Sequence, residues 1–135
     1  MASGECGHGM ESAKDEFGRW GEKLAASFLK RQGYRILARN YVSPVGEMDI
    51  VAREGEELVF VEVKTRTSEG FGGPLRAVGR AKRRKIVQVA RSYLARYRLD
   101  ECPCRFDVVG ITRVEGRKAP DIELVRGAFT VTGHP

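Results

Sequence analysis

Residues 58–64, Leu-Val-Phe-Val-Glu-Val-Lys, form the most hydrophobic β-type run of the chain. Such a density of β-branched and aromatic residues favours a strand buried in a sheet. Side chains alternate along a strand, so Glu62 and Lys64 share one face with Phe60, and the valines occupy the other face. A carboxylate and an ammonium group in such a strand are not ordinary solvated residues. The run therefore predicts a central strand that carries two charged groups.

Periodicity and turn residues predict six further elements. Apolar residues at helical spacing, including Phe17 and Trp20, which are expected in the core, predict a helix over residues 15–32. A second helical pattern covers residues 76–98 and follows a glycine-rich loop at 68–74. Apolar runs predict strands over residues 34–41, 47–52, 105–112 and, as a shorter strand near the edge, 122–125.

The connections between these elements predict the topology. The short turn at residues 54–56 joins two strands as an antiparallel hairpin. The helix at 76–98 connects two strands by a crossover, which favours a parallel pair. The expected fold is therefore α/β, with a central mixed sheet flanked by helices in the order α-β-β-β-α-β-β.

The length of the chain allows one domain. A folded chain of 135 residues buries roughly two thirds of the surface that its unfolded form exposes, which suffices for a single core. Residues 1–14 are rich in glycine, serine and charge and are predicted to be a disordered arm. A single domain is expected over residues 15–135.

Positive charge is concentrated in the second helical segment. Residues 76–98 hold nine basic residues and no acidic one, whereas the rest of the chain carries a small net negative charge. The apolar face of this helix is predicted to contain Ile86, Val89, Ala90, Tyr93 and Tyr97, with Val87 and Leu94 at its edge. The absence of acidic residues favours a polyanionic partner, because each phosphate that is neutralised releases counterions. A merely solvated helix stays an alternative.

Several other classes of protein are disfavoured. No apolar run approaches the roughly 18 residues that span a bilayer, and the N-terminus lacks the apolar stretch of a signal peptide, so a cytoplasmic protein without a membrane partner is expected. Cys6, Cys102 and Cys104 predict neither a disulfide framework nor a zinc site, because their spacing fits neither. Asp107, at the start of a buried strand, is expected to pair with a basic residue such as Arg105.

Acidic residues suggest a metal site beside the central strand. Asp49 lies among apolar neighbours, and the predicted hairpin brings it alongside Glu62. Two adjacent carboxylates repel each other unless a cation lies between them, and Mg²⁺ or Mn²⁺ prefers such oxygen ligands. Glu22, at the edge of the first helix's apolar stripe, is a candidate third carboxylate. A lone Glu-x-Lys is also compatible with an ordinary cross-strand ion pair.

The order of these motifs resembles a known nuclease pattern. Asp49, then thirteen residues later Glu62-Val63-Lys64, followed by a glycine-rich loop and a basic helix, is the order of the PD-(D/E)xK motif, with Met48 in place of the proline. More closely, the chain resembles the YraN-like family of small bacterial proteins, which is similar in fold to the archaeal Holliday junction resolvases. The resemblance covers about residues 16–130 and rests on Gly21-Glu22, Asn40-Tyr41, Gly46-Glu47-Met48-Asp49-Ile50-Val51, Phe60-Val61-Glu62-Val63-Lys64-Thr65-Arg66, Lys82 and Arg105-Phe106-Asp107-Val108.

The resemblance implies a restriction-endonuclease-like core and a catalytic set of Asp49, Glu62 and Lys64, to which Glu22 is added by its match to the helical acid of the resolvase-like branch. In phosphodiester chemistry, Asp49, Glu62 and the Val63 carbonyl would hold Mg²⁺ or Mn²⁺. Lys64 would orient the attacking water or stabilise the charge that develops on the phosphate. Glu47 and Thr65 are expected to support these residues.

The expected substrate is DNA, including branched or damaged DNA. The residues predicted to contact it are Arg66, Lys82, Arg83, Arg84 and Arg91. The expected function is a metal-dependent DNA endonuclease. The alternative is a non-catalytic nucleic-acid-binding or adaptor protein that retains the nuclease fold and works with a DNA-processing partner. Whether two chains pair as a homodimer stays open.

Overall fold

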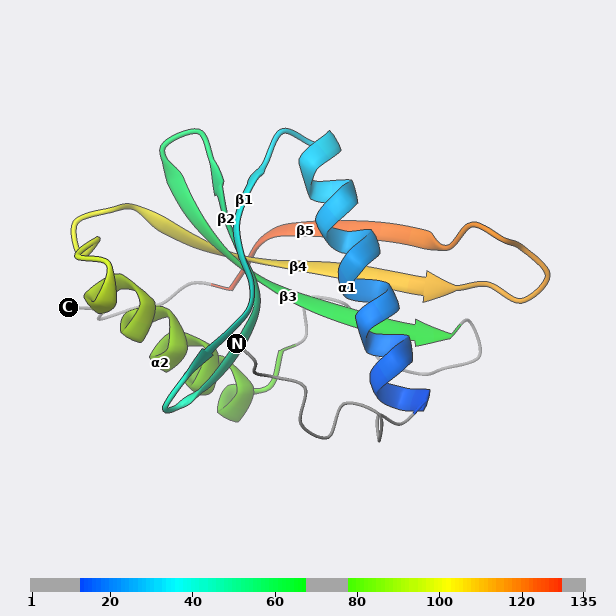
Figure 1. The fold of residues 1–135 in the computed structure, drawn as a ribbon, viewed down its shortest axis with the longest axis horizontal. Coiled ribbons are helices and arrows are strands. Elements are labelled where there is room, and N and C mark those ends of the chain that lie inside the picture. The colour runs from blue at the N-terminus through cyan, green and yellow to red at the C-terminus, as the bar shows by residue number, and fades with distance from the viewer. Residues whose placement is uncertain (1–12, 68–77, 130–135) are drawn as a thin grey trace, which may run out of the picture.

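β3 (Glu57–Thr67) is the middle strand of the sheet in the computed structural model, which describes residues 13–67 and 78–129 (Figure 1). The five strands follow the order β1-β2-β3-β4-β5, and only the pair β3–β4 is parallel. The predicted mixed sheet and the order α-β-β-β-α-β-β are confirmed. The other strands are β1 (Arg35–Ser43), β2 (Gly46–Glu54), β4 (Cys104–Arg113) and β5 (Asp121–Phe129).

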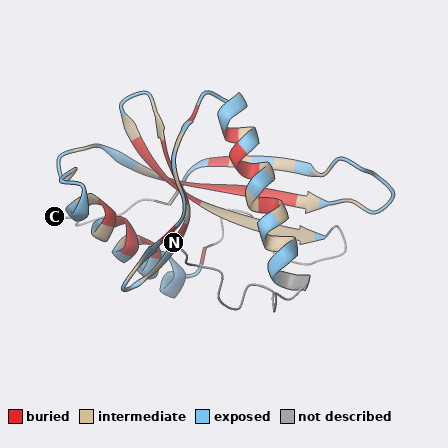
Figure 2. Cartoon of the chain, viewed as in Figure 1, coloured by how far each residue is buried: buried red, intermediate tan, exposed pale blue. Residues whose placement is uncertain are grey.

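Two helices cover opposite faces of this sheet, because β3 is apolar on both faces. α1 (Ala13–Arg31) packs through residues such as Leu29 against Val59 and Val61 of β3. α2 (Arg80–Arg96) packs through residues such as Val89 against Phe60 on the other face. Figure 2 shows buried residues along the middle strands and on one side of each helix. No helix within the described residues is long and apolar enough to cross a membrane.

The ends of several elements differ from the prediction. α1 begins at Ala13, inside the predicted arm of residues 1–14, and the rest of that arm lies outside the described residues. The loop at 68–74 and residues 76–77 also lie outside them. Each strand extends beyond its apolar run, because ladder hydrogen bonds continue through polar residues. β5 is the largest case, with nine residues instead of the four predicted at 122–125.

α2 is shorter than the predicted 76–98. Gly79 has an extended backbone, with φ −61° and ψ 157°, and serves as the N-cap. At the other end, Arg98 adopts a left-handed φ of 57°, which helical residues do not adopt. Tyr97 is therefore the C-cap and is 48% exposed, so its placement on the buried face was wrong. Ile86, Val89, Ala90 and Tyr93 are buried as predicted.

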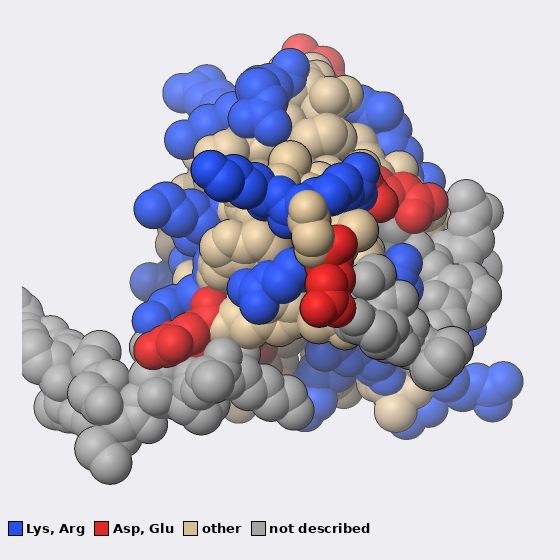
Figure 3. Space-filling view, turned by 90° about the vertical axis from the view of Figure 1, so that its right-hand side faces the viewer, with Lys and Arg blue, Asp and Glu red and all other residues tan. Residues whose placement is uncertain are grey.

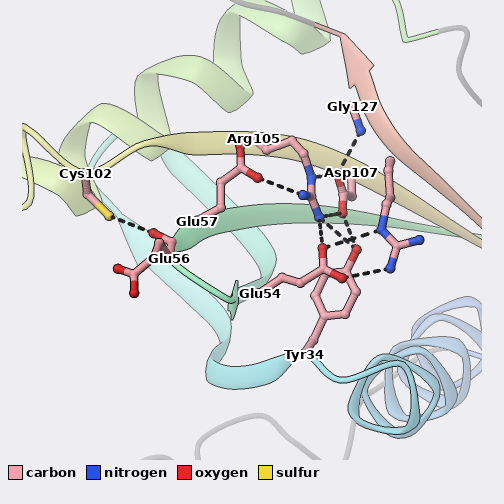
Figure 4. A network of polar contacts seen from close by, with 9 residues as sticks. Tyr34, Glu54, Glu56, Glu57, Cys102, Arg105, Asp107 and Gly127 are labelled. Atoms are coloured by element: carbon pink, nitrogen blue, oxygen red, sulfur yellow. Dashed lines mark hydrogen bonds and ion pairs between the residues drawn. The ribbon is translucent and has the colours of Figure 1, made fainter.

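A buried ion pair ties the strands together at the end of the sheet where β4 begins (Figure 4). The Asp107 side chain is fully buried, and Arg105 donates to both of its oxygens at 2.8 and 2.9 Å, which confirms the expected pair. The same guanidinium bonds Glu54 of β2 and Glu57 of β3. The Tyr34 hydroxyl donates to Asp107 at 2.7 Å, and burial raises the pKa of Tyr34. Every strand except the edge strand β1 thus contributes to or borders this network.

Asp107 also accepts a backbone hydrogen bond where the ladder between β4 and β5 is interrupted. The ladder between β4 and β5 shifts register between Phe106 and Val108, and Gly127 there has a positive φ of 60°. The Gly127 amide donates to Asp107 Oδ1 at 2.9 Å in place of a ladder bond. The carboxylate is thus satisfied by a guanidinium, a hydroxyl and a backbone amide, so it has a structural role.

Removal of this carboxylate should be costly. In Asp107→Ala, Arg105, Tyr34 and the Gly127 amide all lose a buried acceptor, so we expect the free energy of unfolding to fall by about 3 kcal/mol or more. Asp121→Ala is the control, because Asp121 forms an exposed ion pair with Arg117 and should cost less than about 0.5 kcal/mol. Chemical denaturation measures both values, and equal losses would contradict the structural role.

Candidate active site

Asp49 lies where β2 and β3 separate. The antiparallel ladder between these strands starts at the hairpin pair Glu54–Glu57 and ends at Ile50–Val61, so Asp49 is the first residue of β2 beyond it. Its carboxylate takes over the pairing, because the Val63 amide donates to Asp49 Oδ2 at 2.8 Å. The hairpin register therefore places Asp49 beside β3 at the residues that the sequence singled out.

The local shape of β2 supports this separation. Met48 and Val51 both pack in the core under α2, whereas Ile50 and Ala52 pack under α1, so strict alternation is interrupted at Asp49. On the neighbouring strand, Asn40 has a left-handed φ of 53° at the same level. In Figure 1, β1 and β2 curl away from β3 beyond this point. Met48, which stands where the motif has proline, is fully buried and anchors the strand next to Asp49.

The surroundings of Asp49 disfavour its negative charge. The pKa of its carboxyl is raised to about 7, first by burial and then by the negative charge of Glu62, with a smaller contribution from Glu22. The Val63 amide and Lys82 act in the opposite direction without cancelling the effect. Asp49 thus differs from Asp107, because it lies among other carboxylates and has no guanidinium partner within the described residues.

Glu62 forms an ion pair with a lysine of α2. Lys82 of α2 lies with its Nζ 3.2 Å from Glu62 Oε2, and the Glu62 side chain is only 16% exposed. The sequence assigned Lys82 to DNA contact, but the structure places it in the site. No sequence pattern indicated this ion pair, because it depends on how the start of α2 packs across the sheet.

Lys64 lies on the same face of β3 as Glu62. Val59, Val61 and Val63 point into the core under α1, so Glu62 and Lys64 share the other face, as predicted, and the structure shows that this is the side of α2. Lys64 is half-buried. Glu47, in contrast, is exposed and in register with Val42 of the edge strand, so it belongs to the rim of the site.

The close approach of α1 brings Glu22 toward the site. A Cβ on Gly21 would overlap the Thr65 side chain, so only glycine lets the helix pack this tightly against β3. Thr65 is half-buried in this contact, where it positions the helix. The next residue, Glu22, is half-buried and close enough to Asp49 to raise its pKa.

The remaining predicted DNA contacts fall into two groups. Arg66 and Arg83 have partners within the chain: Arg66 Nε donates to Thr112 Oγ1, and Arg83 Nε donates to the Val78 carbonyl just before α2. Arg83 also lies over the ring of Phe129. Arg84 and Arg91 are exposed on α2, as a helix that contacts phosphates requires.

The donor set fits a hard divalent cation. No group of three or more His, Cys, Asp or Glu side chains within residues 13–67 and 78–129 is arranged to hold a metal. The ligand set expected from the sequence has only two carboxylates, Asp49 and Glu62, with the Val63 carbonyl, and the effect of Glu62 on the pKa of Asp49 shows that the two acids are neighbours. Mg²⁺ is often bound through one or two carboxylates, with water and substrate phosphate as the other ligands. Repulsion between the two acids also favours a cation at this position, although Lys82 already compensates part of the charge of Glu62.

Comparisons with known proteins cover the whole candidate site. A model of the uncharacterised protein family UPF0102 matches residues 21–111. A UPF0102 protein of Syntrophotalea carbinolica is 53% identical over 116 residues, which cover 86% of this chain and 93% of that protein. Another, from Moorella thermoacetica, is 46% identical and covers 83% of this chain and 93% of that protein. One from Anaeromyxobacter sp. is 43% identical over 100% of this chain and 98% of that protein.

The raised pKa of Asp49 predicts how stability depends on pH without metal. Between its ordinary value of 3.8 and about 7, the folded state holds a proton that the unfolded state has lost, so the free energy of unfolding falls as pH rises and levels off above 7. The full loss is about 4 kcal/mol at most, at 1.36 kcal/mol per pKa unit. Asp49→Asn lacks this loss and should be more stable than the wild type at pH 8 in EDTA.

Chemical denaturation at pH 4.5 and 8 checks this prediction. The advantage of Asp49→Asn should narrow to about 1 kcal/mol at pH 4.5, where the wild-type carboxyl is mostly protonated in the folded state. Glu123→Gln, an exposed change on β5, is the control and should stay within about 0.5 kcal/mol of the wild type at both pH values. An Asp49→Asn difference that does not change with pH would contradict the raised pKa.

Proposed function

The chain belongs to the uncharacterised protein family UPF0102, and we propose that this member is a metal-dependent endonuclease that hydrolyses phosphodiester bonds in DNA. The observation that carries the proposal is the half-buried Asp49 carboxylate, held by the Val63 amide and crowded by Glu62. A partly buried acid with such like-charged neighbours is typical of functional sites, because the repulsion lowers stability and serves no packing purpose.

The metal of this proposal is Mg²⁺ or Mn²⁺, held by Asp49, Glu62 and the Val63 carbonyl. When bound, it would neutralise charge on the scissile phosphate and lower the pKa of a bound water. The Val63 amide fixes one oxygen of Asp49, so we assign the other oxygen to the metal. Lys82 pairs with Glu62 in this structure, and a metal bound by Glu62 would free its ammonium for a DNA phosphate.

We assign Lys64 to the attacking water or to the charge that develops on the phosphate. It shares the face of β3 with Glu62, so its ammonium would lie on the side from which the acids would hold the metal. There it orients the attacking water or stabilises the charge on the phosphoryl oxygens. Glu22 increases the negative charge around Asp49 and thereby the preference of the site for a cation.

A non-catalytic DNA-binding or adaptor role is the second candidate. The ion pair between Lys82 and Glu62 favours it, because it already neutralises one of the two acids without a metal. The two candidates differ in one respect that can be measured: only the enzyme needs the site to bind a divalent ion and to lower a reaction barrier.

Cleavage and metal binding should separate in two variants. We expect the wild type to cut linear, flap or four-way-junction DNA with millimolar Mg²⁺ or Mn²⁺. The metal should also raise its melting temperature, because binding at a metal concentration of 100 Kd adds about 2.7 kcal/mol to the free energy of unfolding. Asp49→Ala should lose both effects. Lys64→Ala should keep the thermal shift and cut at least about 100-fold more slowly, because its role lies in the transition state.

Exposed Glu123→Gln is the control and should behave like the wild type in both assays. If the wild type shows no metal-dependent thermal shift, with or without DNA, and cuts no substrate, the catalytic proposal is wrong and the non-catalytic role replaces it.

DNA affinity should depend on the exposed basic residues of α2. The double charge reversal Arg84→Glu with Arg91→Glu should weaken DNA binding at least about tenfold at 0.1 M salt. The slope of log affinity against log salt concentration should become shallower by the equivalent of about two phosphate contacts. The matched control is Lys30→Glu with Arg31→Glu, two exposed residues in the last turn of α1. Fluorescence anisotropy with labelled DNA at several salt concentrations measures both. If both double variants weaken DNA binding equally, the affinity depends on net charge and not on α2.

A further inference from the structure

Two aromatic rings and an arginine form a stack outside the candidate active site. The rings of Phe17 and Trp20 on α1 lie with their centroids 5.5 Å apart and their planes within 12°. The guanidinium carbon of Arg113, the last residue of β4, lies 4.5 Å from the Phe17 centroid and 4.7 Å from that of Trp20. We call these three residues the α1–β4 stack.

The position of the stack was not predicted. Both aromatic residues were expected in the core, but the structure leaves Phe17 and Trp20 half-buried. Trp20 packs against the core under α1, whereas Phe17 extends the ring surface outward to Arg113. The close contact between Gly21 and Thr65 sets this part of α1 firmly on the sheet.

Arg113 is exposed, and its guanidinium lies beside both rings. Contact with two rings limits the freedom of this side chain, which lowers the entropy lost when its N–H groups bind a ligand. Among residues 13–67 and 78–129, no carboxylate forms an ion pair with Arg113, in contrast to Arg105, Arg117 and Arg126. A planar, oriented guanidinium without an acidic partner is suited to a phosphate group.

The stack lies at the end of the sheet to which the candidate active site also belongs. Arg113 is in register with Thr67, three residues beyond Lys64 on β3, which is about 10 Å along the strands. The stack is on the α1 face and Lys64 on the α2 face, so a ligand must pass around the end of the sheet to reach both. Figure 3 looks onto this end and shows many basic side chains with fewer acidic ones.

We propose that the α1–β4 stack binds a backbone phosphate of the DNA strand that enters the candidate active site. A strand of duplex DNA carries one phosphate per about 3.4 Å of axis, and the path also turns around the end of the sheet, so the stack would contact the strand more than about three nucleotides from the scissile bond. This inference rests on the proposed function for the identity of the partner, DNA. It adds a contact on the face opposite α2, where the sequence located none.

The single tryptophan of the chain makes the stack observable. Trp20 is that residue, so its fluorescence reports on the stack directly. We would titrate the full-length protein in EDTA with fluorescein-labelled duplex DNA by anisotropy, and with unlabelled DNA by tryptophan emission. The variants are Arg113→Gln, which removes the charge, and Arg113→Lys, which keeps the charge without the planar stack. Arg31→Gln, at the other end of α1, is the control.

We expect DNA to change the Trp20 emission of the wild type. Arg113→Gln should bind DNA about tenfold more weakly at 0.1 M salt, with a salt dependence smaller by about one phosphate contact, and should lose the emission change. Arg113→Lys should recover only part of the affinity, and Arg31→Gln should match the wild type. Wild-type affinity in Arg113→Gln, or binding that leaves Trp20 emission unchanged in the wild type, would overturn the inference.

Cleavage is measured in parallel with Mg²⁺ to separate this inference from the proposed function. If Arg113→Gln weakens binding but the wild type cuts no DNA, the stack contact stands and the catalytic proposal fails. If the wild type cuts DNA while Arg113→Gln binds and cuts normally, the enzyme stands and the stack contact fails. If the wild type binds no DNA at all, both fail.

Discussion

The end of the β2–β3 ladder is the constraint on which the candidate site depends. Two strands that part at Ile50 and Val61 leave a backbone amide of β3 without its ladder partner, and Asp49 supplies the acceptor. Because an unsatisfied buried amide costs free energy, this hydrogen bond fixes the carboxylate next to Glu62. The proposed metal would approach the two acids at this separation. Local backbone geometry and candidate chemistry therefore have one origin.

Two aspartates accept a backbone amide at an interrupted ladder, but their electrostatic surroundings are opposite. Asp49 and Asp107 each accept an amide from a neighbouring strand where a ladder is interrupted. Asp107 also receives two bonds from Arg105 and one from Tyr34, so its charge is compensated. Asp49 instead faces Glu62 and Glu22, and its pKa rises to about 7. The comparison distinguishes an aspartate that stabilises the fold from one that lowers stability and is suited to ligand binding.

Charges on the two faces of the sheet have different partners. On the α2 face, Lys82 neutralises Glu62, and Arg84 and Arg91 extend the positive charge along the helix. On the α1 face, Gly21 allows the helix to approach β3, which brings Glu22 toward Asp49 and the Phe17–Trp20 rings toward Arg113. The acidic residues around Asp49 thus have the exposed basic residues of α2 on one side and, on the α1 face, a single arginine beside two aromatic rings.

The sequence by itself determined the element order, the mixed sheet and the position of Asp49 beside Glu62, because alternation, turn length and crossover length are local properties of the chain. It also named Arg105, two residues away on the same strand, as one candidate partner of Asp107. It did not indicate the Lys82–Glu62 pair, the exposed C-cap at Tyr97, or the contact of Arg113 with Phe17 and Trp20. These depend on how each helix is placed on the sheet. That placement follows from packing between residues far apart in the chain, such as Gly21 against Thr65, which only the tertiary structure decides.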